Sequence, residues 1–251
     1  MNRRAPVMLL SVLLALGFLV VVDPIPQPLA YHAFADTRRL LGIDHGWNVL
    51  SNLGFLVVGI WGLVADWRGR LVHDAVPGFP QWRLFFAGVA LTGLGSAWYH
   101  LDPSNATLLW DRLPMAVAFM ALTTALLSEL WGRELQRRLL YPLLLAGIGS
   151  VLYWHFTESE GAGDLRPYLL VQFLPMLIIP LAVFTGRPRY TRAGDLGWVF
   201  GGYGLAKVLE MLDGPIQAAL GVVSGHSLKH LVAALAAGAV LAMLHRRRPL
   251  G

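Results

Sequence analysis

The feature that most constrains the fold is a series of eight long apolar segments, separated by connections in which arginine is frequent. A transmembrane helix needs about 20 consecutive, mostly apolar residues. Of the 251 residues, 56% are hydrophobic and only 14% are charged, whereas about a quarter of the residues in soluble domains are charged. The sequence therefore predicts an all-α, polytopic membrane helix bundle. The segments cover approximately residues 7–22, 47–65, 83–101, 109–130, 138–156, 167–185, 196–212 and 226–245.

The arginines lie in every second connection, and this alternation predicts the orientation of the segments. Lys and Arg are retained on the cytoplasmic side of a membrane, so both termini are expected inside the cell. The opposite connections and the adjoining helix ends hold most of the acidic residues. The high arginine content favours a bacterial inner membrane, with the other face toward the periplasm. The arginines assigned to the inner side are Arg3, Arg4, Arg68, Arg70, Arg83, Arg133, Arg137, Arg138, Arg187, Arg189, Arg192, Arg246, Arg247 and Arg248.

The first apolar segment has two interpretations. Arg3 and Arg4 followed by an apolar run resemble a signal peptide, but no small-residue cleavage site follows directly, because the next residues are Val-Val-Val-Asp-Pro at 20–24. We favour an uncleaved first helix; cleavage would leave seven helices in the same orientation. Residues 1–30 are therefore expected to form an N-terminal transmembrane or signal-anchor segment with the start of an outer loop. Residues 31–251 are expected to form a seven-helix core.

Charge and cysteine content exclude several classes of function. The net charge of +5 comes from arginine clusters between apolar segments, not from a basic stripe on a soluble module, so nucleic acid is not an expected partner. The chain has no cysteine, which excludes disulfides, thiolate metal sites and cysteine nucleophiles. Any metal must therefore be held by His, Asp, Glu or hydroxyl ligands. Nothing in the sequence indicates an oligomeric state.

Five polar residues are predicted to meet at the outer face. His100 ends the third segment, with Ser96 one turn deeper on the same helix face. Asp111 falls in the first turn of the fourth segment, which starts outside. His226 and His230 open the last segment and share a face, because residues four apart are neighbours on a helix. Ionisable side chains near lipid are costly and usually mark function. Because these five residues are expected at the same depth in the membrane, the sequence predicts a functional site there.

The chemistry of these residues fits hydrolysis assisted by zinc. Three imidazoles bind zinc and leave a fourth position for water, and bound zinc lowers the pKa of that water and polarises a carbonyl. Asp111 is the candidate general base, which would pass the proton to a leaving amine. Ser96 is the candidate hydrogen-bond donor to the oxyanion.

Each residue also has an ordinary interpretation, and three other functions remain open. Ser96 alone fits a helix serine bonded to its own backbone, and Asp111 fits a favourable charge near a helix N-terminus. The main alternative is a non-enzymatic receptor or scaffold with a structural zinc site, in which Asp111 would be the fourth ligand. His226 and His230 also suit haem, although two ligands on one helix turn do not reach opposite faces of one haem. A transporter is the third alternative.

Other polar residues on the outer side are expected to have structural roles. Asn48, Ser51 and Asn52 open the second segment, where a helix cap or a packing contact is expected. Lys207 and Glu210 are three residues apart and are expected to pair with each other. The histidines expected to face solvent or the interface, and not to bind metal, are His32, His45 and His155.

The same residues resemble a known family. The motif Gly-Ser-x-x-x-His at 95–100, the motif Asp-Arg-x-Pro-Met at 111–115 and the motif His-x-x-x-His at 226–230 are similar to those of the alkaline ceramidases. That family belongs to a superfamily of seven-helix membrane hydrolases, which includes the adiponectin receptors and the haemolysin III-like proteins. The stretch Trp-Asn-Val-Leu-Ser-Asn at 47–52 also looks like the first core helix of that family. The similarity extends over residues 31–246.

The resemblance implies a function and a set of ligands. It implies Zn²⁺ held by His100, His226 and His230, with Ser96 and Asp111 beside it. It also implies a lipid substrate, ceramide or another N-acyl lipid, whose amide bond is hydrolysed. Eukaryotic members carry in addition a calcium site formed by acidic residues of an N-terminal loop. This chain has Phe34, Asp36 and His45 in that region and few carboxylates, which does not favour a calcium site built from oxygen ligands. The extra N-terminal segment is a second departure.

Overall fold

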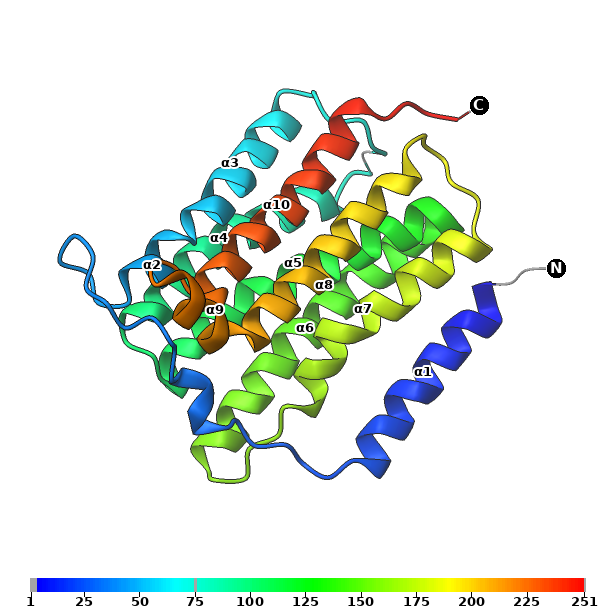
Figure 1. The fold of residues 1–251 in the computed structure, drawn as a ribbon. Coiled ribbons are helices and arrows are strands. Elements are labelled where there is room, and N and C mark those ends of the chain that lie inside the picture. Colours follow the sequence, from blue (N-terminus) through cyan, green and yellow to red (C-terminus); the bar gives the residue numbers. More distant parts are fainter. Residues whose placement is uncertain (1–3, 75, 251) are drawn as a thin grey trace.

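The computed structural model describes residues 4–74 and 76–250, and in these ranges the chain is helical, with no strand beyond isolated bridges. Figure 1 shows the helices packed as one bundle around a shared axis. The helices are, in chain order, α1 (Arg4–Val21), η1 (Leu29–His32), α2 (Gly46–Leu50), α3 (Leu53–Trp67), α4 (Gln81–Leu101), α5 (Asn105–Trp131), α6 (Glu134–Ser159), α7 (Arg166–Thr185), η2 (Ala193–Asp195), α8 (Leu196–Met211), α9 (Asp213–Leu220) and α10 (Gly225–Arg246). The predicted all-α fold is confirmed.

Seven helical stretches in the described ranges are long and apolar enough to cross a membrane: α1, α2 with α3, α4, α5, α6, α7 and α10. The chain is therefore an integral, multi-pass membrane protein. The seventh of the eight predicted segments corresponds to α8, which is not among these seven stretches because it has 16 residues, or about 24 Å of helix at 1.5 Å per residue. It nevertheless runs the length of the bundle beside α10 (Figure 1).

The long helices alternate in direction, so both ends of the described chain lie at the same end of the bundle (Figure 1). The connections at this end, called the arginine end below, contain Arg68, Arg70, Arg133, Arg187 and Arg192. The opposite end carries the connection at 22–45, α9 and the start of α10. This alternation places the last turn of α4 and the first turns of α5 and α10 at the same end.

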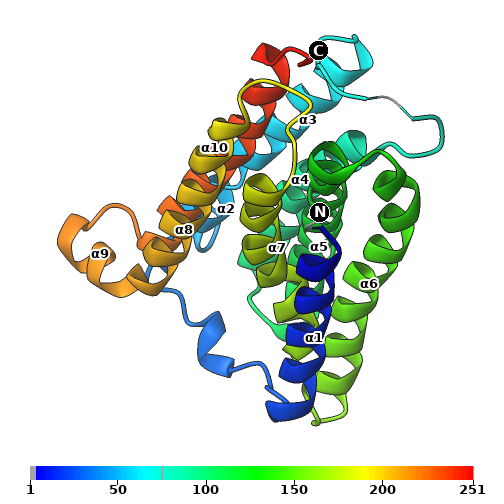
Figure 2. The same cartoon turned by 90° about the vertical axis from the view of Figure 1, so that its right-hand side faces the viewer.

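Helix α1 lies along the outside of the core, next to α7 (Figure 2). Its only buried residue is Ser11, as expected for a helix that faces lipid over most of its surface. Polar contacts hold both of its ends. Arg4 donates a hydrogen bond to Glu134 over 2.6 Å, and Arg166 donates to the carbonyl oxygen of Leu19 over 2.9 Å. Whether this segment is cleaved stays a prediction.

A buried ion pair fixes the end of α10 at the arginine end. Arg247 donates from both terminal nitrogens to the two carboxylate oxygens of Glu129 in α5, each over 2.7 Å. Its guanidinium also stacks 4.1 Å from the ring centroid of Tyr190, in the connection between α7 and α8. A buried charge needs a partner of this kind, because taking it out of water costs several kcal/mol.

Two boundaries differ from the predicted ones. Helix α5 begins at Asn105, four residues before the predicted segment, because Ser104 and Thr107 form a reciprocal capping box at its start. Asp111 therefore lies in the second turn of α5, not in the first, and the helix N-terminus does not account for its position. In addition, the predicted second segment is split into α2 and α3 at Ser51 and Asn52.

Candidate active site

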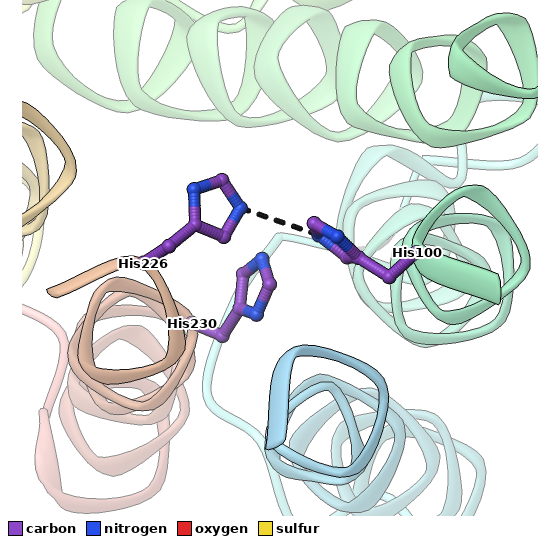
Figure 3. A group of neighbouring side chains, drawn as sticks. All are labelled: His100, His226 and His230. Atoms are coloured by element: carbon purple, nitrogen blue, oxygen red, sulfur yellow. Dashed lines mark hydrogen bonds between the residues drawn. The ribbon is translucent and has the colours of Figure 1, made fainter. Parts of the chain in front are cut away.

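Three histidines from two helices lie close together (Figure 3), at the end of the bundle opposite the arginine end (Figure 1). His100 comes from the last turn of α4, and His226 and His230 come from the first two turns of α10. All three side chains are buried, with 1%, 4% and 3% of their surface exposed. The Nε2 atoms of His100 and His226 lie 3.2 Å apart. The predicted convergence of these three imidazoles is confirmed.

The start of α10 is held by contacts that fix the two histidines. Ser224 caps the helix by accepting a hydrogen bond from the backbone N–H of Ser227. The backbone N–H of His226 donates to Oδ1 of Asp213, the first residue of α9, over 2.7 Å. Gly225 is required here, because a Cβ at this position would lie 2.2 Å from the carbonyl oxygen of Leu209. The end of α8 and the start of α10 are thus in close backbone contact.

Ser51 and Asn48 support the histidine helix from the break between α2 and α3. The hydroxyl of Ser51 lies 2.8 Å from Nδ1 of His230 and donates to the carbonyl oxygen of Asn48 over 3.2 Å. Because that proton is already used, Ser51 accepts from Nδ1 of His230, and Nε2 of His230 is left as a ligand atom. Asn48 in turn accepts a hydrogen bond from Ser227 over 2.6 Å. From the sequence we expected only a helix cap or a packing contact here. The motif Asn-x-x-Ser-Asn at 48–52 was the one sequence feature that could have indicated contacts with the histidine helix.

The three imidazoles fit a metal ion. In a tetrahedral site with metal–nitrogen distances of about 2.0–2.1 Å, two ligand nitrogens lie about 3.3 Å apart, which matches the 3.2 Å between His100 and His226. One nitrogen from each of the three rings lies within 4.8 Å of the others. Imidazole suits zinc, copper, iron and nickel. In residues 4–74 and 76–250 no carboxylate belongs to this group, which offers three imidazole nitrogens to a metal ion.

Ser96 and Asp111 lie next to each other where α4 and α5 touch. Ser96 is buried, its hydroxyl lies close enough to the carboxyl group of Asp111 to interact with it, and both side chains line one cavity. The preceding glycine makes this contact possible, because a Cβ on Gly95 would lie only 2.0 Å from the carbonyl oxygen of Trp110. The two predicted residues are therefore paired with each other.

A cavity of about 330 Å³ connects this pair to the interior of the bundle. His230, Ser96 and Asp111 line it at one end, and Leu126 and Val240 line it further along. Leu126 follows Asp111 by 15 residues on α5, or about 22 Å of helix. Most of the lining side chains are apolar and come from α4, α5, α7, α8 and α10. The cavity is thus long and apolar, with its polar groups gathered at the histidine end.

The connection between α1 and α2 covers the histidines. The ring of Phe34 is buried and lies 4.5 Å, centroid to centroid, from both His100 and His226. His32 is half-buried and hydrogen-bonded through its two ring nitrogens, to Tyr99 over 2.8 Å and to Asn105 over 2.9 Å. The expectation that His32 faces solvent or the interface is therefore wrong.

An arginine fastens this cover to the loop before α10. Arg38 donates hydrogen bonds to the carbonyl oxygens of Gly221 and Val222 over 2.6 and 2.7 Å, and it pairs with the carboxylate of Asp36 over 2.7 Å. The hydrogen bond from Arg38 lowers the pKa of the buried Asp36, although burial of the carboxyl group acts in the opposite direction. Asp36 therefore stays ionised near neutral pH and keeps Arg38 in place.

Three charged side chains from α8 and α10 form a cluster beside the cavity. The predicted pairing of Lys207 with Glu210 is confirmed at 2.7 Å. Lys229, which lies between the two histidines of α10, pairs with the other oxygen of Glu210 at 2.9 Å. The sequence did not reveal the contact of Lys229 with Glu210, because it joins residues from two different helices.

The chain matches a known protein family. A family model described as Ceramidase matches residues 44–183. The matched range contains Ser96, His100 and Asp111 and ends before α8, so His226 and His230 lie outside it. No curated protein matches the chain.

Proposed function

The chain belongs to the ceramidase family, and we propose on this basis that it is a zinc-dependent membrane amidohydrolase that cleaves ceramide or another N-acyl lipid. The family implies hydrolysis of an amide bond. The single observation that carries the proposal is the grouping of three buried imidazoles, one of which, His230, lines the polar end of a long apolar cavity together with Ser96 and Asp111.

The donor set supports an open metal site. A structural zinc site is usually closed by four strong protein ligands, whereas a catalytic site keeps a position for water. The group of ligand atoms consists of three imidazoles without a carboxylate in the described ranges. This favours the enzyme over the alternative of a receptor or scaffold with a structural zinc site.

In the proposed reaction, His100, His226 and His230 would hold Zn²⁺, which when bound would acidify water and polarise the amide carbonyl. Asp111 accepts the proton of the attacking water and transfers it to the leaving nitrogen. The water oxygen forms a bond to the acyl carbon, the C–N bond breaks, and the products are a fatty acid and an amine. Ser96, which lines the same cavity as Asp111, donates a hydrogen bond to the carbonyl oxygen as negative charge develops there.

The cavity supports a lipid as the substrate. An acyl chain lying along α5 and α10 toward Leu126 and Val240 would place its carbonyl carbon at the histidine end. Burial of a long apolar chain stabilises the complex by about 0.8 kcal/mol for each methylene group. This supplies binding energy that a small soluble amide does not have.

We further propose that the site faces the outer side of a bacterial inner membrane. The arginine-rich connections lie at the end of the bundle opposite the histidines (Figure 1). Cytoplasmic retention of arginine then places the arginine end in the cytoplasm and the histidines toward the periplasm.

The proposal is tested by following fatty-acid release from ceramide and from simpler N-acyl amines by the purified protein in detergent. We expect release that stops when a chelator removes the metal and returns when zinc is added back. His226→Ala should abolish release, whereas His245→Ala, at the far end of the same helix, should not. A zinc-loaded wild-type protein that releases no fatty acid from any N-acyl lipid would contradict the proposal.

A further inference from the structure

A buried arginine beside the proposed active site has no anionic partner. Arg112 follows Asp111 in α5, lines the same cavity and is 6% exposed. Its Nη2 donates to the neutral amide oxygen of Gln27 over 2.5 Å. Its Nη1 is buried without a hydrogen-bond partner among the described residues, and no carboxylate lies within ion-pair distance of the guanidinium there. The cation is therefore incompletely satisfied.

The surroundings of Arg112 orient it without neutralising it. The guanidinium lies 4.2 Å from the ring centroid of Trp154, 4.9 Å from that of Tyr168 and 5.7 Å from that of Tyr31. Such aromatic contacts stabilise an arginine modestly, but they leave the N–H groups of Nη1 available for a charge-assisted hydrogen bond to an anion.

The other arginine that is buried among the described residues shows what a purely structural role looks like. Arg247 also stacks on aromatic rings, and both of its terminal nitrogens are bound by Glu129. Breaking such a pair is strongly destabilising, because the remaining charge stays buried. Arg112 has the aromatic contacts but not the carboxylate, so the missing partner of Arg112 is an anion.

The charges along the polar end of the cavity favour the same kind of partner. Arg112, Lys207 and Lys229 line it with Asp111 and Glu210, which makes three cations against two carboxylates. Glu210 is shared by the two lysines, and Asp111 lies beside Ser96. A metal ion on the neutral imidazoles adds further positive charge. A neutral lipid would leave this excess uncompensated in a site shielded from water.

We propose that the lipid substrate carries an anionic group, a carboxylate or a phosphate, on the amine side of the scissile amide, and that Nη1 of Arg112 binds it. This inference rests on the proposed function and names the substrate class: N-acyl amino acids or N-acyl phosphoamines. Hydrolysis of an N-acyl amino acid adds water across the C–N bond and gives a fatty acid and a free amino acid, with the proton of the water on the departing nitrogen.

The test compares three amides that share one acyl chain: N-oleoylglycine, N-oleoylethanolamine and N-oleoylphosphoethanolamine. We expect the zinc-loaded wild-type protein to hydrolyse one of the two anions at least about tenfold faster in kcat/KM than the neutral alcohol, because hydrogen bonds between two charged groups are about twice as strong as neutral ones. The faster anion identifies carboxylate or phosphate as the group recognised. A wild-type protein that hydrolyses the neutral amide at least as fast as both anions would overturn the inference.

Variants of Arg112 distinguish a loss of anion recognition from a loss of folding, because the ratio of kcat/KM for the anionic and the neutral amide does not depend on the amount of folded protein. Arg112→Gln should reduce the anion-to-neutral ratio to near one. Arg112→Lys, which keeps the charge but not the fork of donors, should leave an intermediate ratio. Arg138→Gln, an exposed arginine at the opposite end, should keep the wild-type ratio. An Arg112→Gln protein that slows all three amides equally would overturn the inference.

A binding measurement separates this inference from the proposed function. In His226→Ala protein, which should not turn over, N-oleoylglycine or its phosphate analogue should bind more tightly than N-oleoylethanolamine by isothermal titration. If no amide is hydrolysed by the wild-type protein, the proposed function fails. The difference in affinity between the anionic and neutral ligands then tests by itself whether Arg112 binds an anion. Equal affinity for the three ligands would overturn the anion site even if hydrolysis is observed.

Discussion

The hydroxyl of Ser51 lies 2.8 Å from Nδ1 of His230, and this contact joins the break between α2 and α3 to the group of three histidines. A partner on the second ring nitrogen fixes the tautomer of a ligand histidine and its orientation, and losing such a partner typically weakens metal binding about 10- to 100-fold. We therefore expect Ser51→Ala to weaken zinc binding by this factor, as measured by competition with a chelator. Ser128→Ala removes a buried helix serine bonded to its own backbone and should bind zinc like the wild type. Equal affinity in the two variants would show that Ser51 does not orient His230.

Replacement of Asp111 should separate metal binding from catalysis. Because Asp111 is outside the group of ligand atoms, Asp111→Asn should keep the metal content of the wild type. Its turnover should fall about 100- to 10,000-fold, the usual contribution of a general acid–base residue. Asp195→Asn, which removes the partner of Arg192 at the arginine end, is the matched control. Loss of metal from Asp111→Asn would instead identify Asp111 as a ligand and favour a closed, structural site.

Substitution of Gly95 tests the close contact that positions Ser96. In Gly95→Ala the new methyl group meets the backbone of Trp110, and separation of α4 from α5 should cost about 1–3 kcal/mol, as is typical of overpacking. Gly149→Ala is the matched control, because a Cβ on this helical glycine meets no atom within 4 Å, and it should stabilise the helix by up to about 1 kcal/mol. Denaturant unfolding in detergent measures both. If Gly95→Ala left the free energy of unfolding unchanged, the two helices would tolerate a wider separation.

The cover over the histidines should loosen in acid. Because the folded protein lowers the pKa of Asp36, its ion pair with Arg38 contributes stability that is fully present above the ordinary aspartate pKa of about 3.9. This stability is lost as the pH falls through the lower folded-state value. Hydrogen exchange of residues 30–45 should therefore accelerate in this acid range, and Asp36→Asn should exchange rapidly already at neutral pH. If the exchange of residues 30–45 accelerated in acid to the same extent in Asp36→Asn, another carboxylate would be responsible for the acceleration.

The sequence was sufficient to predict the bundle and the histidine group, because both depend on local pattern. The length of the apolar segments and the alternation of arginines determined which helix ends meet, and the i, i+4 spacing of His226 and His230 determined their common face. Zinc, the roles of Ser96 and Asp111, and the orientation in the membrane stay predictions that the experiments above address.

What the sequence could not predict are contacts between elements distant in the chain. The 2.8 Å contact of Ser51 with His230 depends on how α3 packs against α10. Phe34 reaches the histidines because Arg38 fastens its loop to residues 221 and 222. The missing partner of Arg112 became evident only when its surroundings were known. The start of α5 was the exception, since the Ser-x-x-Thr capping box at 104–107 was a local signal.

The most direct test of the central claim is to measure amide hydrolysis by the wild-type protein as zinc is added to the metal-free form. Turnover should be absent without metal, should rise in proportion to bound zinc, and should reach a plateau at one zinc per chain, since one group of three imidazoles holds one ion. His100→Ala should show neither the bound zinc nor the rise. Turnover in the metal-free protein, or zinc binding without any change in turnover, would contradict the claim that the three histidines form the catalytic centre.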